Sequence, residues 1–421
     1  RDRLDGLETA LLAVVLAASP LLLYFSRFLR GDVVAAGLAL VVLGSLVRAA
    51  AGDARFVPVA GLAAAAALAA SGFAAAYPLL ALVAGAVVVD HERVVGRPAA
   101  ATERLDALLG RLRGSPRTAA AGLGTFLGAV VVLFAPRPLG LDAVTGAVVD
   151  APQAFVGVRV VDRSPEGAHE ILPYLAATAA VVGRAALPVA LLAGLALARL
   201  RYGGVDRRPV VEFAAYWGLA GLFVFPTVAE SLGPWIAVHS VVFLAVPAAV
   251  GGASVVRFGR RAVDRGATRE ALGVAVLLVA LVAQTGVVAA TETYAAPDPD
   301  DTLTTYGQAA DDLEPVHEAA AETGGPVLLY GDEFVIRPES RADAPPVSSR
   351  FGERLPVAWY LARAGVDVRS ATGAAAVADP PPVVVATGSA RTIAATRLDG
   401  YEARSYRTAL WNRRIVVFVR R

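Results

Sequence analysis

The chain has 421 residues, of which 56% are hydrophobic, and its mean hydropathy is +0.57. Its formal net charge of +2 gives no argument for nucleic acid, and a sequence without cysteine excludes disulfides, zinc–thiolate sites and thiol nucleophiles. A soluble protein of this length is not expected to be so apolar, and the composition therefore predicts a membrane protein.

Nine apolar segments follow one another in the first 292 residues. A hydrocarbon core of about 30 Å needs roughly 20 apolar residues in a helix, and we predict about nine transmembrane helices on this basis. The predicted spans are 7–25, 33–50, 56–71, 74–89, 118–135, 172–198, 210–227, 235–256 and 270–291. The third and fourth form one run that Ser71-Gly72 and Tyr77-Pro78 divide, which predicts a tight helical hairpin.

Arginine placement predicts how these helices cross the membrane. With nine spans, one set of alternate loops carries 17 arginines and the other carries five, whereas a single span over 56–89 would remove this asymmetry. The positive-inside rule assigns the arginine-rich loops to the cytoplasm. We therefore expect a protein of the cell membrane with an external C-terminal domain. The cytoplasmic connection 90–117 is expected to contain an amphipathic surface helix, from Thr102 to Leu112.

The polar tail, residues 293–421, alternates short apolar runs with helical patterns. Strands are predicted at 326–330, 366–369 and 382–386, with a closing hairpin at 401–410 and 414–419. Helices are predicted over 354–364 and after Gly388-Ser389 as far as Leu398. This alternation predicts a small α/β domain with a mostly parallel sheet. The turn at 386–389 enters a helix and could hold an anion, but a purely structural turn is the simpler interpretation.

Polar side chains at the expected external end of the first two spans are the first candidates for a site. Tyr24, Arg27, Arg30 and Asp32 fall within fourteen residues of the sequence that begins at Ser19. Arg27 and Arg30 lie three apart and would share one face of a helix. Two guanidinium groups suit a lipid-linked phosphate, which they would bind through paired hydrogen bonds. The alternative is interfacial anchoring by arginine and aromatic side chains.

Two further positions carry charge or polarity into predicted spans. Arg184 lies inside 172–198, where a charge must pair with an acid of another helix or face a polar headgroup cavity. Trp235 and His239 lie four apart at the external end of 235–256, near Glu230. They could contact a sugar or a lipid headgroup, or form part of an aromatic belt with a structural histidine.

Several of these segments resemble a haloarchaeal family of flippase-activity-associated membrane proteins. That family is related to the dolichyl-phosphate-mannose–protein mannosyltransferases of glycosyltransferase family 39. The resemblance runs from about residue 9 to the end. Its fairly specific motifs are 19–32 and 233–247, a further similar segment is 215–219, and the weaker motifs are 354–360 and Leu410-Trp411 in the tail. The lysine-free composition, which is rich in Ala, Val, Gly, Arg and Asp, also suits a halophilic archaeon.

The resemblance implies a GT-C-like helical bundle, in which a catalytic acid stands on the first external loop after the first helix. That helix and loop have no counterpart here, and we expect that the sequence is a piece of a longer chain. A second departure is the segment from Ser71 to Tyr77, where the family is expected to have a Lys-Glu pair. The matched residues Tyr24, Arg27, Arg30, Asp32, Trp235 and His239 therefore receive no catalytic role, only contact with lipid phosphate or sugar.

The function expected from the resemblance is action on polyprenyl- or dolichyl-phosphate-linked sugars in archaeal cell-surface N-glycosylation. The alternatives are an accessory protein for the translocation of such lipids, without transferase activity, and a non-catalytic scaffold for an exported domain. Expected partners are the lipid-linked sugar, membrane lipid and other proteins of the pathway. No Walker loop, serine elbow or metal-spaced carboxylates occur in the sequence. No cofactor is indicated, although a divalent metal stays open.

Overall fold

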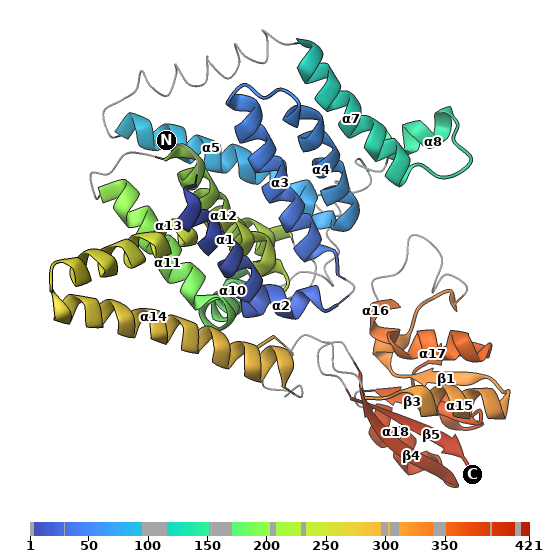
Figure 1. The fold of residues 1–421 in the computed structure, drawn as a ribbon. Coiled ribbons are helices and arrows are strands. Elements are labelled where there is room, and N and C mark those ends of the chain that lie inside the picture. Colours follow the sequence, from blue (N-terminus) through green and yellow to red (C-terminus); the bar gives the residue numbers. More distant parts are fainter. Residues whose placement is uncertain are drawn as a thin grey trace. The chain divides into compact units, whose positions relative to one another are not determined.

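The computed structural model describes residues 4–28, 30–94, 116–150, 153, 171–202, 208–228, 233–295, 302–303, 311–339, 351–387, 390–408 and 414–421. They divide into two compact units, Arg1–Ala295 and Ala296–Arg421. The first unit is helical and the second contains a five-stranded sheet (Figure 1). The predicted surface helix near 102–112 and the turn residues Gly388 and Ser389 lie outside the described residues.

The helical unit contains long apolar helices that correspond to the predicted spans. In chain order its elements are α1 (Gly6–Ala18), α2 (Pro20–Ser26), α3 (Asp32–Ala50), α4 (Phe56–Ala70), η1 (Gly72–Ala76), α5 (Tyr77–Val94), α7 (Pro116–Phe134), α8 (Leu141–Thr145), η2 (Gly146–Asp150), α10 (Ile171–Ala185), α11 (Leu187–Tyr202), α12 (Pro209–Val228), α13 (Ile236–Asp264), α14 (Thr268–Val288) and η5 (Ala289–Tyr294). The run 56–89 is divided at 71–77, where the sequence predicts its break.

Six helices in the described residues are long and apolar enough to cross a membrane. The count rises to eight if the bent pairs α1 with α2 (56°) and α10 with α11 (96°) each form one span. The remaining predicted span corresponds to α4, whose 15 residues reach about 22 Å and fall short of a hydrocarbon core of about 30 Å. A bundle with six to eight candidate spans is thus observed, and the ninth stays a prediction.

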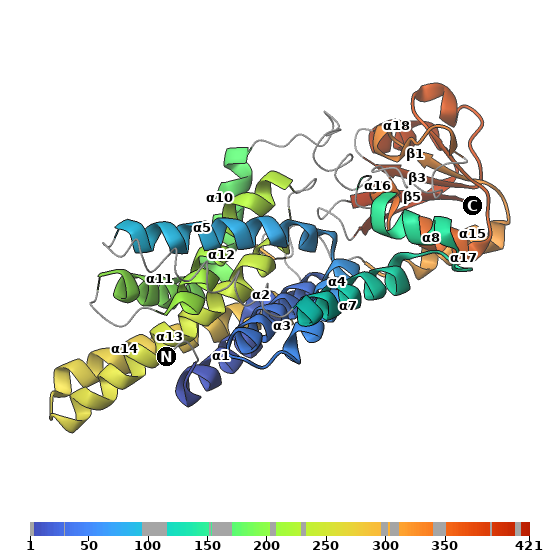
Figure 2. The same cartoon turned by 90° about the horizontal axis from the view of Figure 1, so that it is seen from above.

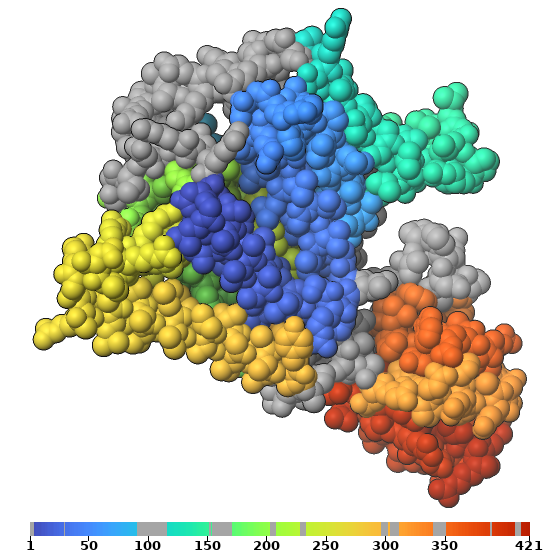
Figure 3. All heavy atoms as spheres, viewed as in Figure 1, coloured from blue at the N-terminus to red at the C-terminus, as the bar shows by residue number. Residues whose placement is uncertain are grey.

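Helix α13 forms the centre of this unit. It contacts α1, α3, α11, α12 and α14, and its most apolar stretch of 18 residues is wholly buried. Small residues permit this packing, because a Cβ added at Gly251 would lie 2.0 Å from the carbonyl oxygen of Leu192 in α11. Helices α3, α4 and α7 lie side by side in both ribbon views (Figure 2). Helix α14 runs along the surface of the unit (Figure 3).

Polar clusters lie near the two ends of α13. Near its C-terminal end, Glu8 is 3% exposed and receives both terminal nitrogens of Arg208, at 2.7 and 2.8 Å. Arg257 of α13 contacts Glu8 as well. His239 lies near the other end of α13, 18 residues from Arg257, which corresponds to about 27 Å of helix. The two polar clusters are therefore separated by about the thickness of a hydrocarbon core.

The C-terminal unit is a three-layer α/β domain. Its strands are β1 (Val327–Tyr330), β2 (Val368–Ala371), β3 (Val383–Thr387), β4 (Tyr401–Arg407) and β5 (Arg414–Arg420), in the order β2-β1-β3-β5-β4. Helices α15 (Glu314–Thr323) and α17 (Val357–Ala364) pack on one face, and α18 (Ala390–Arg397) packs on the other. Short 3₁₀ turns, η6 (Asp332–Phe334) and η8 (Ala374–Val377), follow β1 and β2.

Two details of the predicted C-terminal domain need correction. The sheet is mixed, since β1 pairs in parallel with β2 and β3, whereas β5 pairs antiparallel with β3 and β4. The hairpin of β4 and β5 packs with β5 against β3, and two of the four strand pairings are therefore antiparallel. The predicted helix 354–364 is broken into α16 (Phe351–Arg354) and α17, because Pro356 disfavours a helical conformation at the preceding residue.

Candidate functional site

Asp32 is the centre of a buried polar cluster in the helical unit. It is the first residue of α3 and is 3% exposed. Its Oδ1 accepts hydrogen bonds from Ser71 Oγ at 2.9 Å and from His239 Nε2 at 3.2 Å, and its Oδ2 accepts one from Arg30 Nε at 2.9 Å. Residues from α2–α3, from the α4–η1 junction and from α13 therefore meet at a single carboxylate.

A close backbone approach makes this meeting possible. Gly31 immediately precedes α3, and a Cβ at this position would lie 1.7 Å from the carbonyl oxygen of Ala70. Only glycine lets the loop between α2 and α3 rest against the end of α4. The loop places Asp32 within reach of Ser71, whose hydroxyl also accepts the amide N–H of Phe73.

His239 is enclosed by protein on all sides. Its exposed fraction is 0%, and Phe73, Tyr77 and Phe225 have ring centroids within 6 Å of its own, at 5.6, 5.8 and 4.9 Å. A carboxylate only accepts hydrogen bonds, so Nε2 carries the proton toward Asp32. In the neutral tautomer Nδ1 then accepts the Tyr77 hydroxyl at 2.7 Å. Both ring nitrogens are thus used within the protein.

Arg30 connects the buried cluster to the surface. Its Nε is held by Asp32, and its guanidinium lies 4.0 Å from the centroid of the Trp235 ring. The side chain remains 33% exposed. Among the described residues, its terminal nitrogens have no hydrogen-bond acceptor, so this edge of the fork is open to a ligand.

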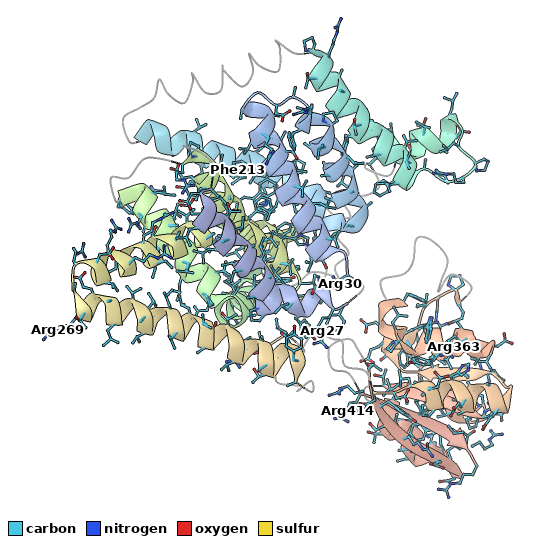
Figure 4. The ribbon with its side chains drawn as sticks, in the orientation of Figure 1. Arg27, Arg30, Phe213, Arg269, Arg363 and Arg414 are labelled. Atoms are coloured by element: carbon cyan, nitrogen blue, oxygen red, sulfur yellow. The ribbon has the colours of Figure 1, made fainter. Side chains whose placement is uncertain are left out.

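Tyr24 in α2 and Arg27 directly after α2 occupy different environments. Arg27 is exposed, donates through Nη1 to the carbonyl oxygen of Thr293 in η5, and lies 5.3 Å from the Tyr294 ring centroid. Tyr24 is buried against Phe25 and Phe28. The expectation that Arg27 and Arg30 share a helical face is wrong, because α2 ends at Ser26 and Arg30 lies in the following loop. Both nevertheless lie at the same end of the unit (Figure 4).

Arg184 takes the first of its two expected roles, the pair with an acid of another helix. Its Nε donates to Glu292 Oε1 of η5 at 2.6 Å, and the carboxylate side chain is 1% exposed. The Arg184 side chain itself is 50% exposed. Its backbone carbonyl accepts a hydrogen bond from Gln284 of α14 at 2.7 Å. Arg184 therefore joins α10 to α14 and still presents half of its surface outside the protein.

The structure brings together four of the six predicted contact residues, namely Arg30, Asp32, Trp235 and His239. Arg27 follows α2 and contacts the η5 turn, and Tyr24 is buried in α2. Sequence reasoning missed Ser71 and Tyr77, which stand in the segment where the resemblance led us to expect a Lys-Glu pair. A hydroxyl at each end of a break in an apolar run was the available signal. Glu230 lies outside the described residues.

The chemistry of this end of the unit favours an anion. The side chains of Arg27, Arg30 and Arg184 are at least partly exposed. The two carboxylates beside them, Asp32 and Glu292, are buried. Guanidinium groups bind phosphate through paired, charge-assisted hydrogen bonds. In the described part of the chain, no three side chains of His, Asp or Glu gather as metal ligands would.

In the C-terminal unit the main polar feature is a buried arginine. Arg354 is 3% exposed and donates from Nε to the Phe334 carbonyl at 2.8 Å and from Nη2 to Ser370 Oγ at 3.0 Å. Both terminal nitrogens also contact the carboxylate of Glu339. The pKa of Glu339 is raised by burial, but hydrogen bonds from Arg354 and Ser370 outweigh this and hold it below its ordinary value. This arginine joins strand β2 to the segment that follows β1.

Comparison with known proteins identifies the C-terminal unit. Residues 308–420 match the family model described as the Agl23 flippase-associated protein C-terminal domain. Over residues 308–420, the resemblance to a flippase-associated family that the sequence indicates is thereby confirmed. No curated protein and no solved structure matches the chain.

Proposed function

We propose that this protein binds the phosphate of a polyprenyl-phosphate-linked sugar and assists the translocation of that lipid for cell-surface glycosylation, without transferring the sugar itself. The observation that carries the proposal is the pair of arginines, Arg27 and Arg30, at one end of an apolar helical bundle. A phosphate held there would sit where the chain of its lipid can lie along apolar helices. The match of the C-terminal unit to a flippase-associated domain supports the same role.

The way the cluster is built supports binding more than catalysis. A general base needs a nitrogen or oxygen free to receive a proton from the substrate. In the described residues, Asp32 uses both carboxylate oxygens and His239 uses both ring nitrogens in contacts within the protein. Asp32 instead holds Arg30, whose guanidinium lies over the Trp235 ring. A preorganised guanidinium loses little conformational freedom when a ligand arrives, which favours affinity.

The positive-inside rule predicts that this site lies on the outer side of the membrane. Arg27 and Arg30 belong to the arginine-poor set of loops, and the arginine-rich loops carry Arg257, Arg261 and Arg269 at the other end of the bundle. Figure 4 shows Arg269 at the opposite end of α14 from Arg27. On this topology the proposed site meets the lipid carrier in the outer leaflet.

Binding of dolichyl phosphate to the protein in nanodiscs tests the proposal. The variant with Arg27→Ala and Arg30→Ala should lose about 2 kcal/mol of binding free energy, roughly 30-fold in affinity, because each exposed charged contact contributes on the order of 1 kcal/mol. Arg269→Ala is the control, since it removes one positive charge from the opposite end of the bundle.

Two results would overturn the proposal. Equal binding of dolichyl phosphate by the wild type and the double variant would remove the phosphate site. Transfer of sugar from a dolichyl-phosphate-linked donor to an acceptor by the purified chain would replace the translocation role with that of a transferase. Loss of binding in the double variant, with the Arg269→Ala control unchanged, supports it.

A further inference from the structure

We infer that Arg184 supplies a third guanidinium to the phosphate site of Arg27 and Arg30, and that buried Glu292 positions it. The inference rests on the proposed function and deepens it. Its starting point is the η5 turn, where Arg184 binds the side chain of Glu292 and Arg27 binds the backbone carbonyl of the next residue, Thr293. Arginines from α10 and from the end of α2 thus reach consecutive residues of one helical turn.

The manner in which Arg184 is held resembles that of Arg30. In each case a carboxylate buried to at least 96% receives Nε, at 2.6 Å in one and 2.9 Å in the other. Within the described residues, neither arginine uses its terminal nitrogens in a hydrogen bond. Both side chains keep substantial exposure, 50% for Arg184 and 33% for Arg30. Each carboxylate fixes the plane of its guanidinium and leaves the two-pronged edge available.

Structural arginine pairs elsewhere in the chain are built differently. Glu8 binds both terminal nitrogens of Arg208, and Glu339 binds both terminal nitrogens of Arg354. Those arginines are only 16% and 3% exposed. Such pairs consume the edge of the guanidinium that would recognise phosphate. The pairs Arg30–Asp32 and Arg184–Glu292 leave that edge open, and in this they differ from the two structural pairs.

The backbone at Arg184 is also held in place. Helix α10 ends at Ala185, and α11 departs from it at 96°. The carbonyl groups at a helix end lack partners within the helix, and Gln284 of α14 donates to that of Arg184. With its backbone and its Nε both fixed, the Arg184 guanidinium has a defined position. A phosphate that binds Arg27, Arg30 and Arg184 would bridge α10 and the segment from α2 to α3.

A substitution by lysine separates ligand binding from the ion pair. Lysine keeps the positive charge beside Glu292, but its single ammonium lacks the fork that serves a carboxylate and a phosphate together. The test compares Arg184→Lys, Arg184→Gln and Arg269→Lys with the wild type. It measures dolichyl phosphate binding in nanodiscs and the melting temperature of the full chain. The last is the control at the opposite end of α14.

Arg184→Lys should bind dolichyl phosphate about tenfold more weakly than the wild type, which corresponds to about 1.4 kcal/mol, with an unchanged melting temperature. Arg184→Gln should bind at least as weakly, and Arg269→Lys should bind normally. Wild-type affinity in Arg184→Lys, with a lowered melting temperature in Arg184→Gln, would show a purely structural pair and overturn the inference. If Arg27→Ala with Arg30→Ala weakens binding but Arg184→Lys does not, only this inference fails. If no variant differs from the wild type, the proposed function fails with it.

Discussion

Replacement of Asp32 by asparagine tests the buried cluster most sharply. Asparagine keeps the size of the side chain and one oxygen that can accept from Ser71 and His239. Its amide nitrogen would face Arg30 Nε, so that two donors meet where a charged pair stood at 2.9 Å. The pair with Arg30 is discounted to about 1 kcal/mol because the Arg30 side chain is 33% exposed.

The other two hydrogen bonds change from charged to neutral, which costs roughly 0.5–1 kcal/mol for each. The expected loss is therefore about 2–3 kcal/mol in the free energy of unfolding. Titration of the protein in mixed micelles with a denaturing detergent measures this difference. Glu270→Gln is the control, because Glu270 forms an exposed pair with Arg265 at 3.1 Å and should change stability little. A change below about 0.5 kcal/mol for Asp32→Asn would refute the idea that this carboxylate organises the cluster.

Three further predictions concern stability. Arg354→Met should destabilise the C-terminal unit by about 2 kcal/mol, because the buried Phe334 carbonyl loses its donor and Glu339, whose side chain is 35% exposed, keeps only the donor Ser370; unchanged hydrogen exchange in β1 and β2 would contradict this. Glu339 has a lowered pKa in the folded state, so its contribution is complete above its unfolded pKa of about 4.5 and is lost as the pH falls through its folded pKa. Glu339→Gln should flatten that acid limb in a pH series of hydrogen exchange, and an unaltered limb would count against it. Gly31→Ala should lower the melting temperature, since its Cβ would lie 1.7 Å from Ala70 O, whereas Gly37→Ala in the open part of α3 should raise it slightly; equal effects would exclude the close approach.

Local patterns predicted much of the fold. The apolar run 56–89 breaks between Ser71 and Tyr77, where Ser71-Gly72 and Tyr77-Pro78 interrupt it. Strands β1 and β3 form where runs of buried apolar residues end at turn signals. The antiparallel docking of β5 on β3 depends on contacts between distant segments, which no local pattern contains. Helix α4 has only 15 residues because it ends at Ala70, directly before the break at Ser71.

The candidate site was predictable in its parts and not in its assembly. Arg30 and Asp32 are neighbours in the sequence, and Trp235 and His239 are four apart, so each pair stood out. Their convergence joins residues 207 apart in the chain, and Glu292 lies 108 residues from Arg184. Only tertiary packing can bring such pairs together. The exposure of the Arg30 and Arg184 guanidinium groups depends on the same packing, because burial decides which of their nitrogens can bind a ligand.

Sidedness decides whether the site can meet a carrier in the outer leaflet. The sequence contains no cysteine, so one introduced thiol gives a unique label. Intact cells are treated with a membrane-impermeant maleimide, with Glu318→Cys at an exposed position of α15 and Arg269→Cys in the first turn of α14 as the two variants. The Glu318→Cys protein should react in intact cells, and the Arg269→Cys protein should react only after lysis. The reverse pattern would place the arginine site and the C-terminal domain inside the cell and contradict the proposed role at the outer surface.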